Sequence, residues 1–504
     1  MVEEETKLSG GLDLVSADDA LGPTMFRRGD NGRLTPFGAF LKRGGTQRTA
    51  AALNGTVPVR SGYTWNKSDG TSVVLAVAGG ALYTTSYGAF PLTWTLRGAN
   101  PSLSTTVPPG MVHFISGTST EAVYIADGGL LNKYQGTTLT VNIATTPSCN
   151  QLAVHNERLW GCGDAAFPDS IFYSALNDGD TLGIGASGGG QIVVRTFGSE
   201  NVIGLKSLGT SLMIVHPRGI SRLTGYGQSD VTVSPAGITK DVGTIAPFSL
   251  VVVDNLLYFV SERGLYVASE QDVAPVNTPQ QPDPLSVILP SLTIANIANI
   301  RAELNRATRE VLITVPQVGV FVYHTILKAW SGPWVDGYLN PETSSLFESV
   351  NTSGYPIVLR GDNSGFVSET DRPSIGLDNV AADGTGGTTY TMALQCRRFF
   401  CGEPHMAKSW RYVYVLASLN GSNSTTITCV TDSTSDAHTL PPSVSGTWGS
   451  GTWGVGTWGG LAQISYRNPM AGQGFFVDVL VTDSGTSEPL FSQIRVQGFL
   501  LGRR

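Results

Sequence analysis

The chain has 504 residues; 41% of them are apolar, only 14% carry charged side chains, and the net charge is −7. The mild acidity excludes the overall basic field of a nucleic-acid-binding protein, and the apolar content is sufficient for a substantial core. The 61 glycines and the many Thr and Ser residues favour a β-rich protein with numerous tight turns.

The first 50 residues contain the most basic segment of the chain. The opening "MVEEETKLSG" is acidic and does not resemble a secretory signal. Basic and apolar residues then alternate in "RLTPFGAFLKRGG", a pattern typical of a segment that lies across a neighbouring subunit. We therefore predict an extended N-terminal arm over residues 1–50 that becomes ordered only in an assembly. Its contact residues would be Arg27, Arg28, Arg33, Lys42 and Arg43; a merely solvated terminus is the alternative.

Residues 51–385 contain a repeated pattern of an apolar strand, a Gly-rich or polar turn and a second strand. Copies begin at Ser72, Glu121, Glu157, Ser211, Asn255, Glu310 and Tyr355. Their mean period of about 48 residues is within the range of four-stranded propeller blades. The sequence therefore predicts an all-β fold with a six- or seven-bladed β-propeller, and an array of β-sandwiches is the alternative.

Two stretches interrupt this pattern. "PDPLSVILPSLTIANIANI" has helical spacing until Pro290, which predicts a short helix or loop inserted between blades. "GIGASGG" matches two Gly-rich catalytic or nucleotide-binding patterns around Ser187. Both patterns require a following helix, whereas "QIVV" predicts a strand, so we interpret this stretch as a structural loop.

The pattern changes near residue 385, and six alternating strands are expected in residues 386–504. This region is predicted to be a separate β-sandwich or jelly-roll domain. Cys396, Cys401 and His405 match no common zinc-site spacing, so no metal site is expected. All five cysteines of the chain are expected to be free thiols, as in a reducing cytoplasm (Cys149, Cys162, Cys396, Cys401 and Cys429).

Three tryptophans recur every five residues in "SGTWGSGTWGVGTWGG": Trp448, Trp453 and Trp458. In a flat strand an odd step places successive side chains on opposite faces, which does not suit the aligned aromatics of a sugar site. We therefore predict that they anchor a protein–protein or interdomain contact. Packing into the core of the C-terminal domain is the alternative.

Several segments resemble tail proteins of tailed bacteriophages. The arm "ADDALGPTMFRRGDNGRLTPFGAFLKRGGTQR" is similar to the opening of such proteins, in which a related pattern precedes a propeller. The segment "HNERLWGCGDAAFPDSIFYSALNDGDT", the Trp repeat and the closing "FSQIRVQGFLLGRR" also resemble them. The resemblance implies a virion structural protein of the tail nozzle or tail-tip type that forms a homo-oligomer, performs no catalysis and needs no cofactor.

The function expected from this resemblance is to form or seal the conduit for genome ejection. The partners would be copies of the chain in a ring and other tail or connector proteins, and a mildly acidic lumen would let DNA pass without specific binding. The protein would be made in the host cytoplasm and reside in the virion; no apolar run is long enough to span a membrane. The alternatives are a glycan-binding propeller adhesin and, less favoured, a propeller glycoside hydrolase.

Overall fold

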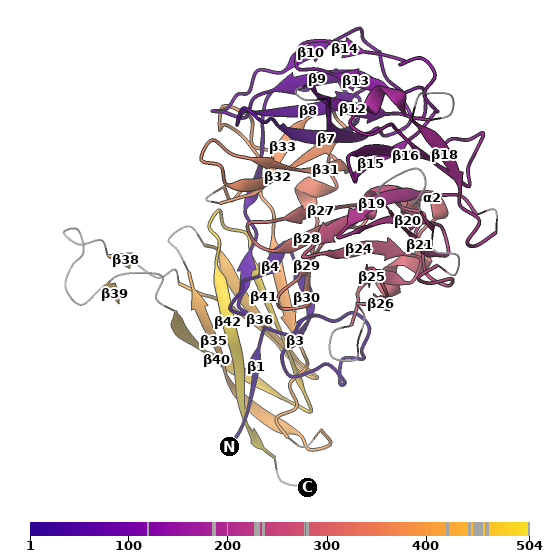
Figure 1. Ribbon diagram of the computed structural model, residues 1–504. Coiled ribbons are helices and arrows are strands. Elements are labelled where there is room, and N and C mark those ends of the chain that lie inside the picture. Colours follow the sequence, from indigo (N-terminus) through magenta and orange to yellow (C-terminus); the bar gives the residue numbers. More distant parts are fainter. Residues whose placement is uncertain are drawn as a thin grey trace.

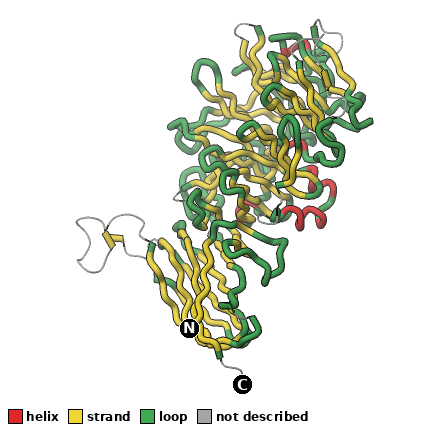
Figure 2. Tube along the Cα trace, turned by 60° about the horizontal axis from the view of Figure 1, so that its bottom comes forward, coloured by secondary structure: helices red, strands yellow, loops and turns green. Residues whose placement is uncertain are grey.

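The computed structural model describes residues 1–117, 120–183, 188–198, 200–225, 232–233, 237–276, 278, 282–373, 375–402, 404–419, 423–441, 445–446, 457–458 and 463–501. Strands contain 50% of the residues and helices 5%, which confirms the all-β prediction. Figures 1 and 2 show a broad body of small sheets joined to a narrower body of long strands, and both chain ends lie at the narrow end.

The broad body consists of small antiparallel sheets whose strands follow one another along the chain. The first sheet comprises β7 (Val59–Asn66), β8 (Ser72–Ala78), β9 (Ala81–Thr85) and β10 (Thr95–Arg97), and the second comprises β11 (Gly110–Ser116), β12 (Thr120–Ala126), β13 (Asn132–Tyr134) and β14 (Leu139–Thr140). The third comprises β15 (Gln151–His155), β16 (Arg158–Cys162), β17 (Ser170–Tyr173) and β18 (Gly190–Val193), and the fourth comprises β19 (Gly204–Leu208), β20 (Ser211–Val215), β21 (Ile220–Thr224) and β22 (Thr232–Val233). The fifth comprises β23 (Val251–Val253), β24 (Leu256–Ser261), β25 (Gly264–Ala268) and β26 (Val273–Pro275). Two further sets follow: β27 (Arg301–Asn305), β28 (Glu310–Val315), β29 (Gly319–His324) and β30 (Ala329–Trp334), and then β31 (Thr343–Val350), β32 (Pro356–Asp362) and β33 (Val367–Arg372).

The repeated hairpins form because their turns accept a left-handed backbone. Gly79 and Gly80, between β8 and β9, have φ values of 58° and 78°. Asp254 and Asn255, between β23 and β24, have φ values of 49° and 60°. Two successive residues with positive φ match the right-handed twist of the flanking strands, and Gly, Asp and Asn are the residues that adopt this conformation most readily.

The sheets of the broad body are arranged in a propeller-like ring. The first strands of most neighbouring sheets contact each other, β19 contacts β24 of the next sheet, and β31 of the last sheet lies against β7 of the first. The central strands are buried on both faces; five consecutive residues of β8 are buried. The last sheet obtains its fourth strand from the N-terminal region, because β6 (Gly45–Arg48) pairs with β33.

The narrow body consists of two sheets that contribute to one core. The six strands predicted after residue 385 all form. One sheet contains β35 (Lys408–Ser418), β40 (Ile464–Gly474) and β42 (Leu490–Leu500), and the other contains β34 (Met392–Cys396), β36 (Thr425–Thr431), β37 (Ser435–Thr439) and β41 (Val477–Asp483). Burial alternates along β36, β41 and most of β35, so each sheet turns one face to the core. The short strands β38 (Ser445–Gly446) and β39 (Thr457–Trp458) pair with each other.

The structure corrects the expectation of a free arm that orders only in an assembly. Residues 2–48 form strands within this chain: β1 (Val2–Lys7), β2 (Gly11–Leu12), β3 (Met25–Asp30), β4 (Gly32–Leu34), β5 (Phe40–Lys42) and β6. Phe26 and Phe40 are fully buried and pack edge to face. The segment orders because it has enough apolar side chains to bury. The prediction relied on its basic residues and did not take these apolar side chains into account.

The N-terminal segment also joins the two bodies. β3 pairs with β30 of the broad body and with β34 of the narrow body, so β27–β30 and the second sheet of the narrow body form one continuous sheet. β1 and β5 pair with β42 in the other sheet. The two bodies are therefore linked by backbone hydrogen bonds as well as by the connecting chain.

Helices are short. The insertion predicted before residue 300 contains α1 (Leu285–Ile288), the 3₁₀ turn η3 (Leu289–Ser291) and α2 (Ile294–Ala298), which confirms a helical break at Pro290. Further 3₁₀ turns are η1 (Gly179–Thr181), η2 (Pro247–Ser249) and η4 (Asp336–Tyr338). In the part of the chain that the structure describes, no helix is long and apolar enough to cross a membrane.

Candidate functional site

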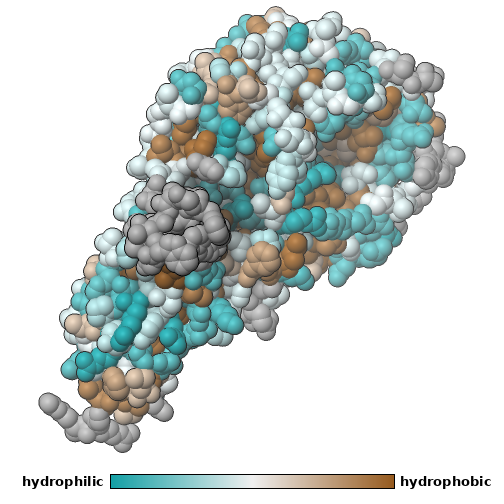
Figure 3. All heavy atoms as spheres, turned by 90° about the vertical axis from the view of Figure 1, so that its left-hand side faces the viewer, coloured by the Kyte–Doolittle hydropathy of each residue, from teal (hydrophilic) through white to brown (hydrophobic). Residues whose placement is uncertain are grey.

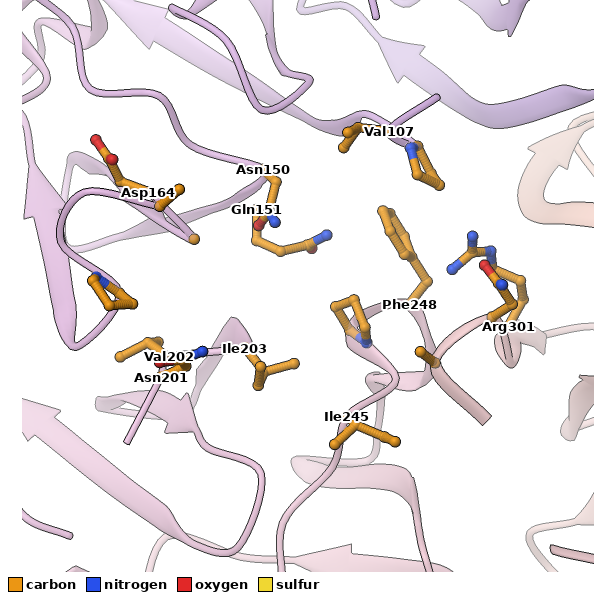
Figure 4. Close-up of a pocket in the computed structure, with 17 residues that line it drawn as sticks. Val107, Asn150, Gln151, Asp164, Asn201, Val202, Ile203, Ile245, Phe248 and Arg301 are labelled. Atoms are coloured by element: carbon orange, nitrogen blue, oxygen red, sulfur yellow. The ribbon is translucent and has the colours of Figure 1, made fainter. Parts of the chain in front are cut away.

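Three adjoining cavities lie where the first strands of the ring begin. The largest, of about 350 Å³, is lined by loops that lead into β11, β15, β19, β23 and β27 (Figure 4). Two others, of about 210 Å³ each, lie beside it, one near β31 and one along the inner strands. Arg301, the first residue of β27, lines all three cavities, and Arg60 of β7 lines two of them.

Arg301 is a buried cation in this cluster of cavities. Only 7% of its surface is exposed, and its guanidinium lies 4.3 Å from the centre of the Phe248 ring. Nε donates a long hydrogen bond of 3.5 Å to the carbonyl oxygen of Ser344. Burial lowers the pKa of Arg301 to about 10, and the nearby charge of Arg60 acts in the same direction.

Arg60 adds a second positive charge to the same cavities. Its Nε donates to the carbonyl oxygen of Thr105 at 2.8 Å. Among the described residues, the ion pairs of the chain include neither Arg60 nor Arg301. Glu342 lines one of the smaller cavities, but its carboxylate accepts hydrogen bonds from the backbone N–H of Gln317 and from the side-chain amide of Asn363.

A second charged pair lies deeper between the inner strands. Lys206 of β19 and Glu303 of β27 both line the third cavity. Burial lowers the pKa of Lys206, and the charge of Glu303 opposes this shift. Burial raises the pKa of Glu303 to about 7, although the Leu304 N–H and Lys206 stabilise its charged form. Glu303 lines the same cavity as Arg60 and Arg301, but the charges that act on its pKa are those of Lys206, Glu348 and Arg306.

The basic residues predicted to contact a partner are mostly bound within the chain. Arg43 is fully buried and donates two hydrogen bonds to Asp378, at 2.7 and 2.6 Å. Lys42 is also fully buried and lies 3.2 Å from Asp483. The structure therefore corrects the prediction for these two residues: they hold the N-terminal segment in place and are not accessible to another subunit.

The other three arm residues occupy different positions. Arg33 contacts Asp371 and lies 3.5 Å from Glu310, again within the chain. Arg27 donates to the Ser16 carbonyl oxygen at 2.8 Å and lies 3.3 Å from Asp18. The Arg28 side chain is 51% exposed and lies 2.5 Å from Asp30. Of the five residues, Arg28 is the most accessible.

The tryptophan and serine predictions lie outside the described residues. Trp448, Trp453 and Ser187 are not among them, and the structure gives no side-chain environment for Trp458. The five cysteines are free and buried, and burial raises the pKa of each thiol. Among the described residues, no group of three or more His, Cys, Asp or Glu side chains is placed to hold a metal ion.

Sequence analysis missed Arg60, Arg301, Lys206 and Glu303 because they are far apart in the chain and belong to no motif. One signal was present. Arg60 and Arg301 each lie at the beginning of the first strand of a repeat. In a propeller the beginnings of these strands converge around the axis, so charges at equivalent repeat positions are expected to meet.

Comparisons with known proteins show only distant similarity of shape. No protein-family model matches the chain, and no curated protein matches it. The extracellular domain of a hybrid two-component system from B. thetaiotaomicron matches 64% of this chain with 12% identity and a TM-score of 0.40. That of a one-component system from the same organism matches 70%, also with 12% identity, and has a TM-score of 0.44. The N-terminal domain of Nup159 matches 68% with 11% identity and a TM-score of 0.40. The matched part spans 41%, 46% and 98% of these chains, respectively, so it is less than half of each bacterial domain.

Proposed function

We propose that this chain is a structural subunit of a tailed-phage virion, a tail nozzle, tip or connector protein that forms or seals the genome-delivery conduit together with copies of itself. In this proposal the broad body is a seven-bladed propeller, the β31–β33 blade being completed by β6. The narrow body is a β-sandwich. The segments that resemble phage tail proteins motivate the proposal, and the way the two bodies are joined supports it.

The observation that carries the proposal is the continuous sheet through β3. Domains connected by a small polar interface usually move relative to each other. Here a backbone ladder runs from β27 to β37, and one core cluster contains Trp330 of the broad body together with Val413 and Val479 of the narrow body. Rotation of one body against the other would break both. A fixed orientation is what a subunit of a mechanically loaded conduit requires.

The surface of the narrow end is also suited to contact with neighbours. Figure 3 shows apolar atoms gathered at this end. Met1, Phe475, Phe499 and Leu500 are 73%, 47%, 40% and 41% exposed, respectively. Clustered apolar side chains on a protein surface commonly mark protein–protein contacts. The proposal assigns this end to contacts with another subunit of the tail.

Immunogold electron microscopy tests the proposal. Antibody against the purified chain should label the tail of the phage particles that encode it, at a constant position. Gold label absent from intact and from disrupted particles, although present in infected cells, would reject a virion role.

A triple substitution tests the predicted tryptophan contact. Changing Trp448, Trp453 and Trp458 together to Ala should abolish incorporation into particles while the melting temperature of the monomer stays unchanged, because interface aromatics contribute mainly to association. A lower melting temperature of the monomer would instead assign the rings to its core. If the triple variant is incorporated into particles normally but loses glycan binding, the alternative function of a glycan-binding adhesin would be favoured.

A further inference from the structure

We propose that the cavities around Arg60 and Arg301 are a binding site for a small acidic sugar, whose carboxylate or phosphate group lies between the two guanidinium groups. This site is independent of the proposed role in the virion. Three features support this site: a buried cation that forms no ion pair among the described residues, adjoining cavities of suitable size, and the polar groups that line them.

The first step concerns charge. Burying an ionised group is unfavourable unless an opposite charge or sufficient hydrogen bonds compensate for it. Only 7% of the surface of Arg301 is exposed. Among the described residues, its guanidinium contacts the Phe248 ring and donates one long hydrogen bond to the carbonyl oxygen of Ser344. Arg60 increases the positive potential at the same place, and its charge contributes to the lowered pKa of Arg301. An oxyanion bound between them would supply the missing negative charge.

The second step concerns geometry. Guanidinium groups bind carboxylate and phosphate through paired N–H donors, which fixes the orientation of the anion. Figure 4 shows Arg301 directed toward Phe248, with Gln151 pointing toward them from the opposite wall of the pocket. The cavity of about 350 Å³ is lined by Arg301, Phe248 and Gln151, and the two adjoining cavities, of about 210 Å³ each, are lined by both Arg301 and Arg60. Together these volumes are suitable for a ligand of sugar size. The anion would therefore lie at the wall formed by β27.

The third step concerns the rest of the ligand. The neighbouring cavity is lined by amide and hydroxyl side chains from α2, from β31 and from the adjoining turns (Asn296, Asn299, Gln317, Thr343, Ser344 and Asn363). Phe248 adds an apolar ring face beside Arg301. Carboxamides and hydroxyls that both donate and accept hydrogen bonds match the hydroxyls of a sugar, and an aromatic face matches its C–H groups. This combination favours an acidic sugar over a bare inorganic anion.

Calorimetric titration of the full chain with four probes tests the proposal: D-glucuronate, glucose 6-phosphate, glucose and inorganic phosphate. We expect at least one acidic sugar to bind at least tenfold more tightly than glucose and phosphate. The first two probes distinguish a carboxylate site from a phosphate site. Equal binding of phosphate and glucose 6-phosphate, with no binding of glucuronate, would overturn the assignment to a sugar. Absence of binding by all four probes would overturn the site.

Substitutions at Arg301 locate the site. Arg301→Met keeps the apolar contact with Phe248 but removes the charge, so affinity should fall by about tenfold to a hundredfold, the value of a hydrogen bond to a charged group. Arg301→Lys should retain part of the affinity. Arg411→Gln, an exposed arginine on β35, is the control and should bind as the wild type does. Unchanged affinity in Arg301→Met would overturn the proposal.

Melting temperatures separate this result from misfolding. Without ligand, Arg301→Met should melt at or above the wild-type temperature, because it removes a buried charge that no acid of the described chain neutralises. The acidic sugar that binds should raise the melting temperature of the wild type but not of Arg301→Met. A loss of stability in the ligand-free variant would assign Arg301 to the fold and overturn the proposal.

Discussion

Two buried arginines of this chain have opposite surroundings. Arg43, in the N-terminal segment, has a two-point contact with Asp378, and its guanidinium lies 3.9 Å from the centre of the Tyr390 ring. Arg301, at the axis of the ring, also lies against an aromatic ring but has no carboxylate partner among the described residues. The charge of Arg43 is thus balanced by a carboxylate of the chain, whereas the charge of Arg301 stands beside a cavity without such a partner among the described residues.

The difference separates a structural role from a binding role. Burial lowers the pKa of Arg43, but the Asp378 carboxylate, together with Tyr338 and Tyr390, holds it above its ordinary value. Both burial and Arg60 lower the pKa of Arg301. A buried charge with a complete set of partners fixes the position of a segment. A buried charge without them, directed at a cavity, indicates a site whose partner comes from outside.

The largest effect is expected from deleting residues 1–50. The deletion removes β6 from the last sheet, β3 from the continuous sheet and Phe26 and Phe40 from the core. The truncated chain should be insoluble or should lack a cooperative unfolding transition, as measured by circular dichroism and calorimetry. Deleting only residues 1–7, which removes the single strand β1, is the control and should leave a folded protein. A truncated chain without residues 1–50 that still unfolds cooperatively would show that the segment is dispensable.

The next largest effect is expected from Arg43→Met. This substitution leaves the fully buried carboxylate of Asp378 without its cation, and breaking such a pair costs about 3–5 kcal/mol of unfolding free energy. Denaturant titration should show this loss, whereas Arg301→Met should show none. The double variant Arg43→Met/Asp378→Leu, which removes both charges, should recover part of the stability. Equal losses for the two single arginine variants would eliminate the distinction between the two sites.

The sequence predicted the repeated elements well because their signals are local. Alternating apolar residues and turns such as Gly79–Gly80 depend on neighbours in the chain, and the corresponding hairpins form. The six strands after residue 385 were predictable for the same reason. The ring-like arrangement followed from the period of the repeat.

The contacts of the N-terminal segment were not predictable in this way. Whether Lys42 meets solvent, another subunit or Asp483 depends on a partner 441 positions away in the chain. The composition of the segment is compatible with all three. The candidate site was missed for a similar reason, because Arg60 and Arg301 meet only when the ring closes.

A smaller, pH-dependent effect is expected from Glu303→Gln. Burial raises the pKa of Glu303 from 4.5 to about 7, so between these values the folded chain binds more protons than the unfolded chain. The contribution of Glu303 to stability is therefore complete below about pH 4.5 and is lost as the pH rises through about 7. The melting temperature of Glu303→Gln should fall less between pH 5 and pH 8 than that of the wild type. Glu262→Gln, at an exposed turn, is the control and should follow the wild-type curve; an identical curve for Glu303→Gln would contradict the assignment.

The smallest effect on stability is expected from Arg28→Ala. Its side chain is 51% exposed, and exposed ion pairs such as the one with Asp30 contribute at most about 1 kcal/mol, often less. The melting temperature of the isolated chain should therefore stay within about 2 °C of the wild type, in contrast to Arg43→Met. Because Arg28 is the most accessible of the five arm residues proposed as contacts, the same variant should be incorporated less efficiently into phage particles, measured by quantitative immunoblotting of purified virions. Arg263→Ala, an exposed arginine in the turn between β24 and β25 of the broad body, controls for loss of surface charge alone. Normal incorporation of Arg28→Ala would remove the most accessible arginine of the segment from the proposed interface, and a marked loss of stability would place Arg28 with Arg43 among the residues that hold the fold together.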